Sequence, residues 1–158
     1  MSNKQINTKS VARIAAIQAL YQFENSQDKS NIDSILIRII DFYKDKNIKN
    51  DYELEENSSL KIKPSYNYLK ELVLLSAENI KEIDLEIKEH LSQDWQIQDL
   101  PVLLLSLLRV SFAEIKYFPE TPKKVIINEY TDIASDMLDE NEIGFVNSLL
   151  DNYAAKCK

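Results

Sequence analysis

The sequence predicts an all-α fold of about seven helices arranged in two packed helical bundles. Three observations lead to this fold class. Apolar residues recur at three- and four-residue spacing, one glycine occurs in 158 residues, and helix-capping residues precede several of the periodic segments. Glycine supplies the positive φ angles that hairpins and strand bulges need, so its scarcity favours helices joined by short polar loops. It also argues against a glycine-rich nucleotide-binding loop.

The chain is expected to form one domain over residues 1–158, whose N-terminal helical half covers about residues 8–45. The first predicted helix carries one apolar stripe, formed by Val11, Ile14, Ala15, Ile17, Leu20 and Tyr21. It runs from about Thr8 to Asn25. The second opens at Ser30, whose hydroxyl is a favourable N-cap. Apolar periodicity is then lost, and residues 46–63 carry several acids, which is typical of a surface loop.

The C-terminal helical half covers about residues 64–156. The helical pattern resumes at Pro64, and Asn79 is a predicted break because a periodic stretch of about 27 residues is more typical of two helices. Asp99 is predicted to cap the next helix, with Pro101 in its first turn. That helix is apolar around nearly its whole circumference, so we expect it at the centre of its bundle.

Two more helices complete the predicted fold. Thr121 is a favourable N-cap and Pro122 a favourable first helical residue, so together they predict a helix start. Asp139 and Glu142 stand three residues apart and predict a capping box at the start of the last helix.

The charge distribution permits a local phosphate site at the N-terminus. The net charge of −7 argues against broad nucleic-acid binding. The first 23 residues, however, contain Lys4, Lys9 and Arg13 and no acid. Lys9 and Arg13 are four residues apart on one helix face, so both charged groups can reach one ligand. The alternative is an ordinary solvated helix face.

The residue inventory argues against an enzyme. His90 is the single histidine and Cys157 the single cysteine, so neither a metal cluster nor a catalytic triad is supported, and no catalytic residue, metal or cofactor is predicted. The polar start shows no secretory leader, and one cysteine fits a reducing compartment. The strongest apolar run, residues 100–110, is too short for a bilayer and contains Arg109. A cytoplasmic location is therefore expected.

Five short motifs in order resemble the NusB family of bacterial transcription antitermination factors. They are Arg13–Tyr21, Trp95 followed by Leu100-Pro101, Leu107-Leu108-Arg109 with Glu114 five residues later, residues 125–129, and residues 145–151. The resemblance implies an all-α fold of two perpendicular helical bundles. It also implies a transcription antitermination factor that binds boxA-type single-stranded RNA together with NusE, a small-subunit ribosomal protein. Such a factor attaches to elongating RNA polymerase and acts notably on ribosomal RNA operons.

The resemblance also implies which residues contact RNA. Lys4, Lys9 and Arg13 would neutralise phosphates. In the last helix they are joined by Asn141, Phe145 and Asn147, since a helix N-terminus attracts phosphate and an exposed aromatic ring can stack a base. The family usually carries more basic residues at its start, so we expect weak RNA affinity without the partner. Two alternatives stay open: Phe145 as a core aromatic, and Asn147 as a buried amide, which we favour.

Five other residues are interpreted as structural. Tyr21 is expected to lie mainly in the core with its hydroxyl at the surface. Trp95 is expected to act as a packing anchor, with a stacking platform as the alternative. Arg109 lies on an apolar helix and needs an acidic partner, for which Glu129 is a candidate. Glu114 is likewise interpreted as structural.

Two other functions were weighed. The net negative charge and the small number of basic residues near the N-terminus also fit a helical protein–protein interaction scaffold with little RNA affinity of its own. NusB-like domains also stand at the front of some ribosomal RNA cytosine methyltransferases. The absence of βαβ units and of a glycine-rich cofactor turn disfavours that function for these 158 residues.

Overall fold

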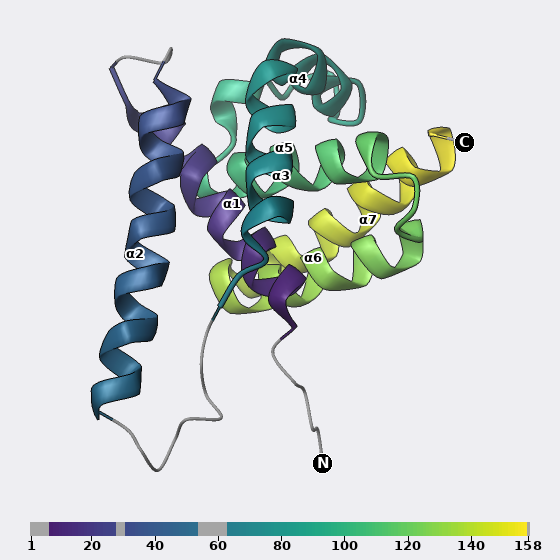
Figure 1. Cartoon of the computed structure of the whole chain (residues 1–158). Coiled ribbons are helices and arrows are strands. Elements are labelled where there is room, and N and C mark those ends of the chain that lie inside the picture. The colour runs from purple at the N-terminus through teal and green to yellow at the C-terminus, as the bar shows by residue number, and fades with distance from the viewer. Residues whose placement is uncertain (1–6, 28–30, 54–62, 158) are drawn as a thin grey trace. The chain divides into compact units, whose positions relative to one another are not determined.

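The computed structural model describes residues 7–27, 31–53 and 63–157, and every regular element within these ranges is helical. The predicted fold class is confirmed. The elements are α1 (Thr8–Asn25), α2 (Ile32–Glu53), α3 (Tyr66–Glu78), α4 (Ile80–Glu89), the 3₁₀ helix η2 (Ile97–Asp99), α5 (Val102–Tyr117), α6 (Lys123–Met137) and α7 (Glu140–Lys156) (Figure 1). The chain divides into two compact units, Met1–Val73 and Leu74–Lys158, and the division falls inside α3.

In the first unit, α1 packs against α2 and has the predicted bounds. Asn7 caps α1, because its Oδ1 accepts a hydrogen bond from the backbone N–H of Lys9 at 2.7 Å. The Tyr43 hydroxyl donates to Gln18 Oε1 at 2.9 Å and so joins α2 to α1. Burial raises the pKa of Tyr43, against the opposing effect of the Gln18 hydrogen bond.

α2 is longer than the sequence pattern predicts. It begins at Ile32, and the predicted cap Ser30 lies outside the described residues. The helix continues to Glu53, so residues 46–53 of the expected loop are helical. No glycine or proline occurs between Ser30 and Pro64, so the sequence contains none of the residues that most strongly end a helix there.

In the second unit, α5 is the central helix, as predicted. It contacts α4, α6 and α7, and every residue from Leu104 to Ile115 is buried. The two buried serine hydroxyls of α5 donate to backbone carbonyls of their own helix, Ser106 to Val102 at 2.8 Å and Ser111 to Leu108 at 3.1 Å. Polar side chains on this helix are therefore satisfied without interrupting its packing.

Of the helix boundaries predicted at Asn79, Asp99, Thr121-Pro122 and Asp139, the first and the last agree with the structure. Asn79 separates α3 from α4, and its Nδ2 donates to the Leu75 carbonyl at 2.9 Å. The capping box of α7 is confirmed, with Asp139 N–H donating to Glu142 Oε1 at 3.1 Å. α6 and α7 form a helical hairpin across this short connection (Figure 1).

The other two starts are shifted. Asp99 does not cap α5, because its Oδ2 accepts from the Gln96 N–H at 2.9 Å and closes η2. Pro101 therefore occupies the cap position of α5 and lies outside the first turn. In α6 the cap is Pro122 and the helix begins at Lys123, one residue later than predicted. Residues 97–99 form a turn of their own, which the pattern of the following helix does not reveal.

Candidate nucleic-acid interface

The two cations of α1 converge on one aromatic ring in the first unit. The Lys9 ammonium lies 5.1 Å and the Arg13 guanidinium carbon 5.7 Å from the centroid of the Tyr68 ring on α3. Both distances are in the range of cation–π contacts. A backbone hydrogen bond joins the start of α1 to the segment before α3, since Ser65 N–H donates to the Thr8 carbonyl at 3.0 Å. The four-residue spacing thus does bring both charged groups to one partner.

The two cations differ in their exposure. Lys9 is exposed, whereas Arg13 is only 2% exposed. The alternative of an ordinary solvated helix face is wrong for Arg13, whereas Lys9 fits it. A contact of Lys9 with RNA stays a prediction, whereas a contact of Arg13 would require its buried guanidinium to leave the Tyr68 ring. Lys4 lies outside the described residues.

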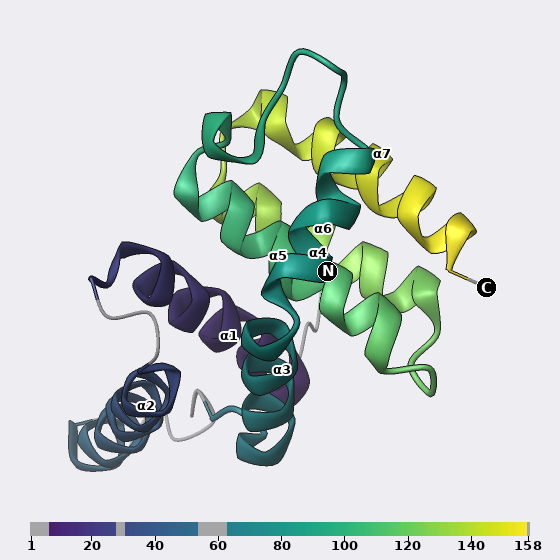
Figure 2. The same ribbon diagram turned by 90° about the horizontal axis from the view of Figure 1, so that it is seen from above.

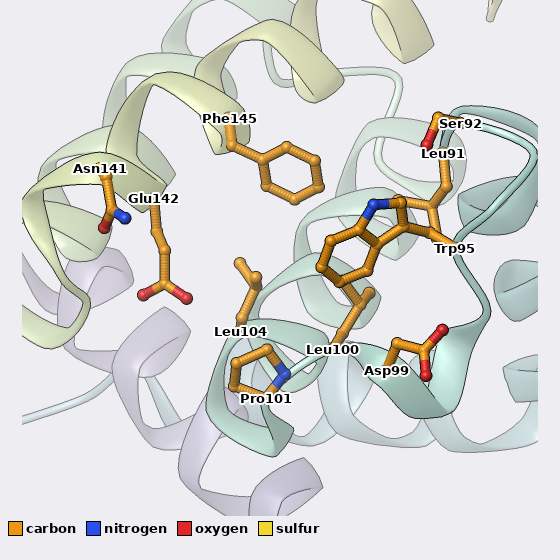
Figure 3. A pocket seen from close by; sticks show the side chains of 10 residues that line it. All are labelled: Leu91, Ser92, Trp95, Asp99, Leu100, Pro101, Leu104, Asn141, Glu142 and Phe145. Carbon is orange, nitrogen blue, oxygen red and sulfur yellow. The ribbon is translucent and has the colours of Figure 1, made fainter.

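The second unit contains an apolar pocket of about 580 Å³. Its walls come from the α4–α5 connection, the first turns of α5 and the first turns of α7, and its lining residues are Leu91, Ser92, Trp95, Asp99, Leu100, Pro101, Leu104, Asn141, Glu142 and Phe145. Figure 2 shows the long connection between α4 and α5 that bears the first of these walls. Figure 3 shows the Trp95 indole and the Phe145 ring projecting into the same space.

The charged residues of this pocket are already engaged. Among the described residues, no Lys, Arg or His lines it. Its two carboxylates both accept backbone N–H groups, Asp99 from Gln96 and Glu142 from Asp139. A phosphate would meet two negative charges and no cation, while a flat uncharged group would meet two rings and aliphatic walls.

The predicted residues of α7 lie partly at this pocket. Asn141 is exposed and Phe145 half-buried, and both line it. Asn147 is exposed, and its Oδ1 accepts a hydrogen bond from the Thr131 hydroxyl at 3.3 Å. The favoured interpretation of Asn147 as a buried amide is therefore wrong. The buried face of α7 passes through Val146 and Leu150 and leaves the neighbouring position 147 at the surface.

Two aromatic residues are more exposed than expected. Tyr21 is 41% exposed, so its core assignment is wrong, because the buried stripe at the end of α1 runs through Leu20 and Phe23 and leaves position 21 outside. Trp95 is 49% exposed, so about half of its surface is buried, and its interpretation as a packing anchor stays a prediction. It lies in the connection between α4 and η2 and lines the pocket of the second unit. Its half-exposed indole favours the alternative interpretation of Trp95 as a stacking platform.

Arg109 pairs with Asp84 of α4, a partner that the sequence did not indicate, and a contact with Glu129 stays a prediction. Nε donates to Oδ1 and Nη2 to Oδ2, each at 2.8 Å. The α4–α5 packing brings Asp84 within reach, which sequence spacing does not show. Glu114 is fully buried and accepts the Tyr130 hydroxyl at 2.6 Å.

A polar network links α4, α5 and α7, and the sequence analysis did not identify it. Lys116 bonds to Glu82 at 2.9 Å and to Glu86 at 3.0 Å, and the Tyr153 hydroxyl donates to Glu86 at 2.9 Å. Burial opposes the charge of Lys116, but the two carboxylate hydrogen bonds prevail and raise its pKa. The only sequence signal is that Glu82 and Glu86 are four residues apart on one face of α4.

Within residues 7–27, 31–53 and 63–157, no group of three His, Cys, Asp or Glu side chains is placed to hold a metal ion. In the same ranges no helix has the length and apolar character to cross a membrane.

The chain is similar to known proteins over almost its whole length. Residues 10–155 match the NusB family. The chain is 50% identical over 154 residues to "Transcription antitermination protein NusB" of Rickettsia rickettsii (strain Sheila Smith), which covers 98% of this chain and 96% of that protein. It is 48% identical over 158 residues to the protein of the same description from Rickettsia bellii (strain OSU 85-389), covering 100% and 97%.

Solved structures share the fold. The structure of T. maritima NusB matches with a TM-score of 0.73 at 25% identity, over 96% of this chain and 94% of that one. NusB in a crystal structure of the antitermination factors NusB and NusE in complex with dsRNA matches with a TM-score of 0.67 at 22% identity, over 93% and 96%. At that identity the second likeness shows the fold alone.

Proposed function

The chain belongs to the NusB family, and we propose that it is a transcription antitermination factor that binds boxA-type single-stranded RNA together with NusE and promotes antitermination by RNA polymerase, notably on ribosomal RNA operons. It acts by binding in the cytoplasm and catalyses nothing. The observation that carries the proposal is the family match over residues 10–155 with about half the residues identical to proteins described as transcription antitermination protein NusB.

The proposed partners are NusE, RNA and the elongating polymerase. A family member of the same fold has been crystallised with NusE and dsRNA, which supports both ligand classes for the family. For the present chain we propose single-stranded RNA, because unstacked bases are what the half-exposed rings of the second unit can stack.

The proposed RNA contacts come from both units. Lys9 is exposed at the start of α1 and would neutralise a phosphate, and Lys4 upstream would add a second. Phe145 would stack a base, with Asn141 and Asn147 on the exposed side of the same helix available for polar contacts.

The proposal is tested by binding of a labelled boxA-type RNA to this chain with and without NusE at several salt concentrations. We expect binding that requires NusE at low salt and a log–log salt slope of roughly −1.5 to −2, as two or three neutralised phosphates give for a single strand. An RNA with a scrambled boxA sequence is the control. Absence of NusE-dependent binding at low salt would rule out the proposal.

One observation favours the scaffold as second candidate function. Arg13 is buried and the chain has a net charge of −7, so the described part of α1 offers Lys9 as its one exposed cation. A scaffold would still bind NusE, but its complex would retain no RNA, and Lys9→Ala would leave assembly unchanged.

A further inference from the structure

We infer that Trp95 and Phe145 form a slot that takes one unstacked base of the bound RNA, with Trp95 as a second stacking ring. This inference rests on the proposed function and adds Trp95 as a binding residue and a single base as the group that it binds. The slot is the 580 Å³ pocket of the second unit (Figure 3). Its size is within the range of sites that take small, flat ligands.

The exposure of the two rings supports a role in binding. Trp95 leaves 49% of its surface exposed, and Phe145 is half-buried. Side chains of this size usually bury most of their apolar surface, so an open pair of rings facing one pocket is a typical stacking surface. Leu100 and Leu104 are buried and line the same pocket, so they offer a bound ring an apolar wall.

The charges around the slot select a base and disfavour a phosphate. Asp99 and Glu142 line the pocket, and no cation does. The first turn of α7 also carries Glu140 and Glu142, and the Asp139 side chain accepts from a backbone N–H of that turn. The anion attraction that a helix N-terminus normally provides is therefore offset here. Phosphates of the same RNA must be bound elsewhere, at cations such as Lys9.

The pocket also offers one group that can recognise a base edge. Asn141 is exposed on the rim, and an amide side chain presents both a donor and an acceptor. Paired hydrogen bonds from asparagine to adenine follow this geometry. The slot should therefore prefer a purine with an adenine-type edge over a pyrimidine.

The single tryptophan makes the slot directly observable. The chain is labelled with fluorotryptophan, so that fluorine NMR reports Trp95 alone, even with unlabelled NusE present. We expect the resonance to move when boxA-type RNA is added to the complex with NusE. In a series of RNAs that each lack the base of one nucleotide, only the RNA without the base that enters the slot should fail to move the resonance.

Two variants and a control measure the contribution of the ring. Trp95→Leu should weaken RNA binding by about 5- to 150-fold, the range expected for loss of one stacked base, without changing the salt slope. Trp95→Phe should restore most of the affinity, because it keeps a ring. Leu85→Ala is the matched control, since Leu85 is 67% exposed on α4 and does not line the slot.

The outcomes separate this inference from the proposed function. RNA that binds in a shift assay while the fluorine resonance stays fixed would overturn the slot and leave the proposed function intact. A resonance that moves fully with NusE alone would also overturn the slot, because a protein side chain would then fill it. If no RNA binds under any condition, the proposed function fails and the slot with it.

Discussion

Arg109 and Asp84 are joined by two hydrogen bonds of 2.8 Å, from Nε to Oδ1 and from Nη2 to Oδ2. The Arg109 side chain is 5% exposed and that of Asp84 25%. A guanidinium on the central helix α5 would be costly to bury alone, and the paired carboxylate of α4 offsets that cost with good geometry. The pair therefore fixes α4 on α5.

Asp84→Asn should lower the free energy of unfolding by about 1.5–3 kcal/mol, because a charge-assisted contact becomes a neutral one beside a buried guanidinium. Urea denaturation measures the change. Asp136→Asn on α6 is the matched control, since Asp136 is exposed, and it should change stability by less than about 0.5 kcal/mol. Equal effects of the two substitutions would contradict the assigned role.

Substitutions of Lys9 and of Arg13 should have different effects on the salt dependence of RNA binding. Lys9→Ala should weaken RNA binding and reduce the salt slope by about 0.7, the contribution of one phosphate on a single strand. Arg13→Met should keep the salt slope and lower stability, because the Arg13 guanidinium is buried over the Tyr68 ring. If Arg13→Met instead reduces the slope as Lys9→Ala does, Arg13 reaches a phosphate in the complex.

The Glu82 carboxylate gives a pH dependence with a defined sign. Hydrogen bonds from Lys116 and then from Tyr117 lower the pKa of Glu82. A lowered carboxyl pKa in the folded state contributes stability above the unfolded pKa of about 4.3, and this contribution is lost as the pH falls through the folded value. The stability difference between the wild-type chain and Glu82→Gln should therefore be constant near neutral pH and shrink in acid. Urea denaturation midpoints measured across pH give this stability difference. Glu120→Gln is the control, since Glu120 is exposed. A stability difference that grows in acid would contradict the lowered pKa of Glu82.

Gly144→Ala tests whether the single glycine has a structural use. Gly144 lies inside α7 and has no positive φ, and a Cβ added there meets no atom within 4 Å. Alanine should therefore stabilise the chain by about 0.5–1 kcal/mol through helix propensity. Thermal unfolding measures this effect. RNA affinity that falls in the same variant would show that the backbone of α7 approaches the ligand closely at this position.

Local sequence signals predicted the helix starts and breaks that depend on one or two neighbouring residues. The bounds of α1, the break at Asn79 and the capping box of Asp139 and Glu142 agree with the structure because each is formed within one turn of chain. The central position of α5 was also predictable, since a helix apolar on all sides must be covered on all sides.

Partner choice and exposure were not predictable in the same way. Arg109 selects Asp84, 25 residues away, and this choice depends on how α4 packs on α5. Trp95 and Tyr21 are apolar enough for a core, and only the packed structure shows that 49% and 41% of their surfaces stay exposed. The pocket itself combines residues of two segments about forty positions apart, of which the sequence analysis selected Phe145 and Asn141 and assigned Trp95 to packing.

The most direct test of the central claim is transcription in vitro across a terminator placed downstream of boxA, with RNA polymerase, NusE and this chain. We predict that adding the chain increases the fraction of full-length transcripts, and that deleting boxA from the template or omitting NusE removes the increase. Equal readthrough with and without the chain, while it still binds NusE, would contradict its assignment as an antitermination factor and leave the scaffold function.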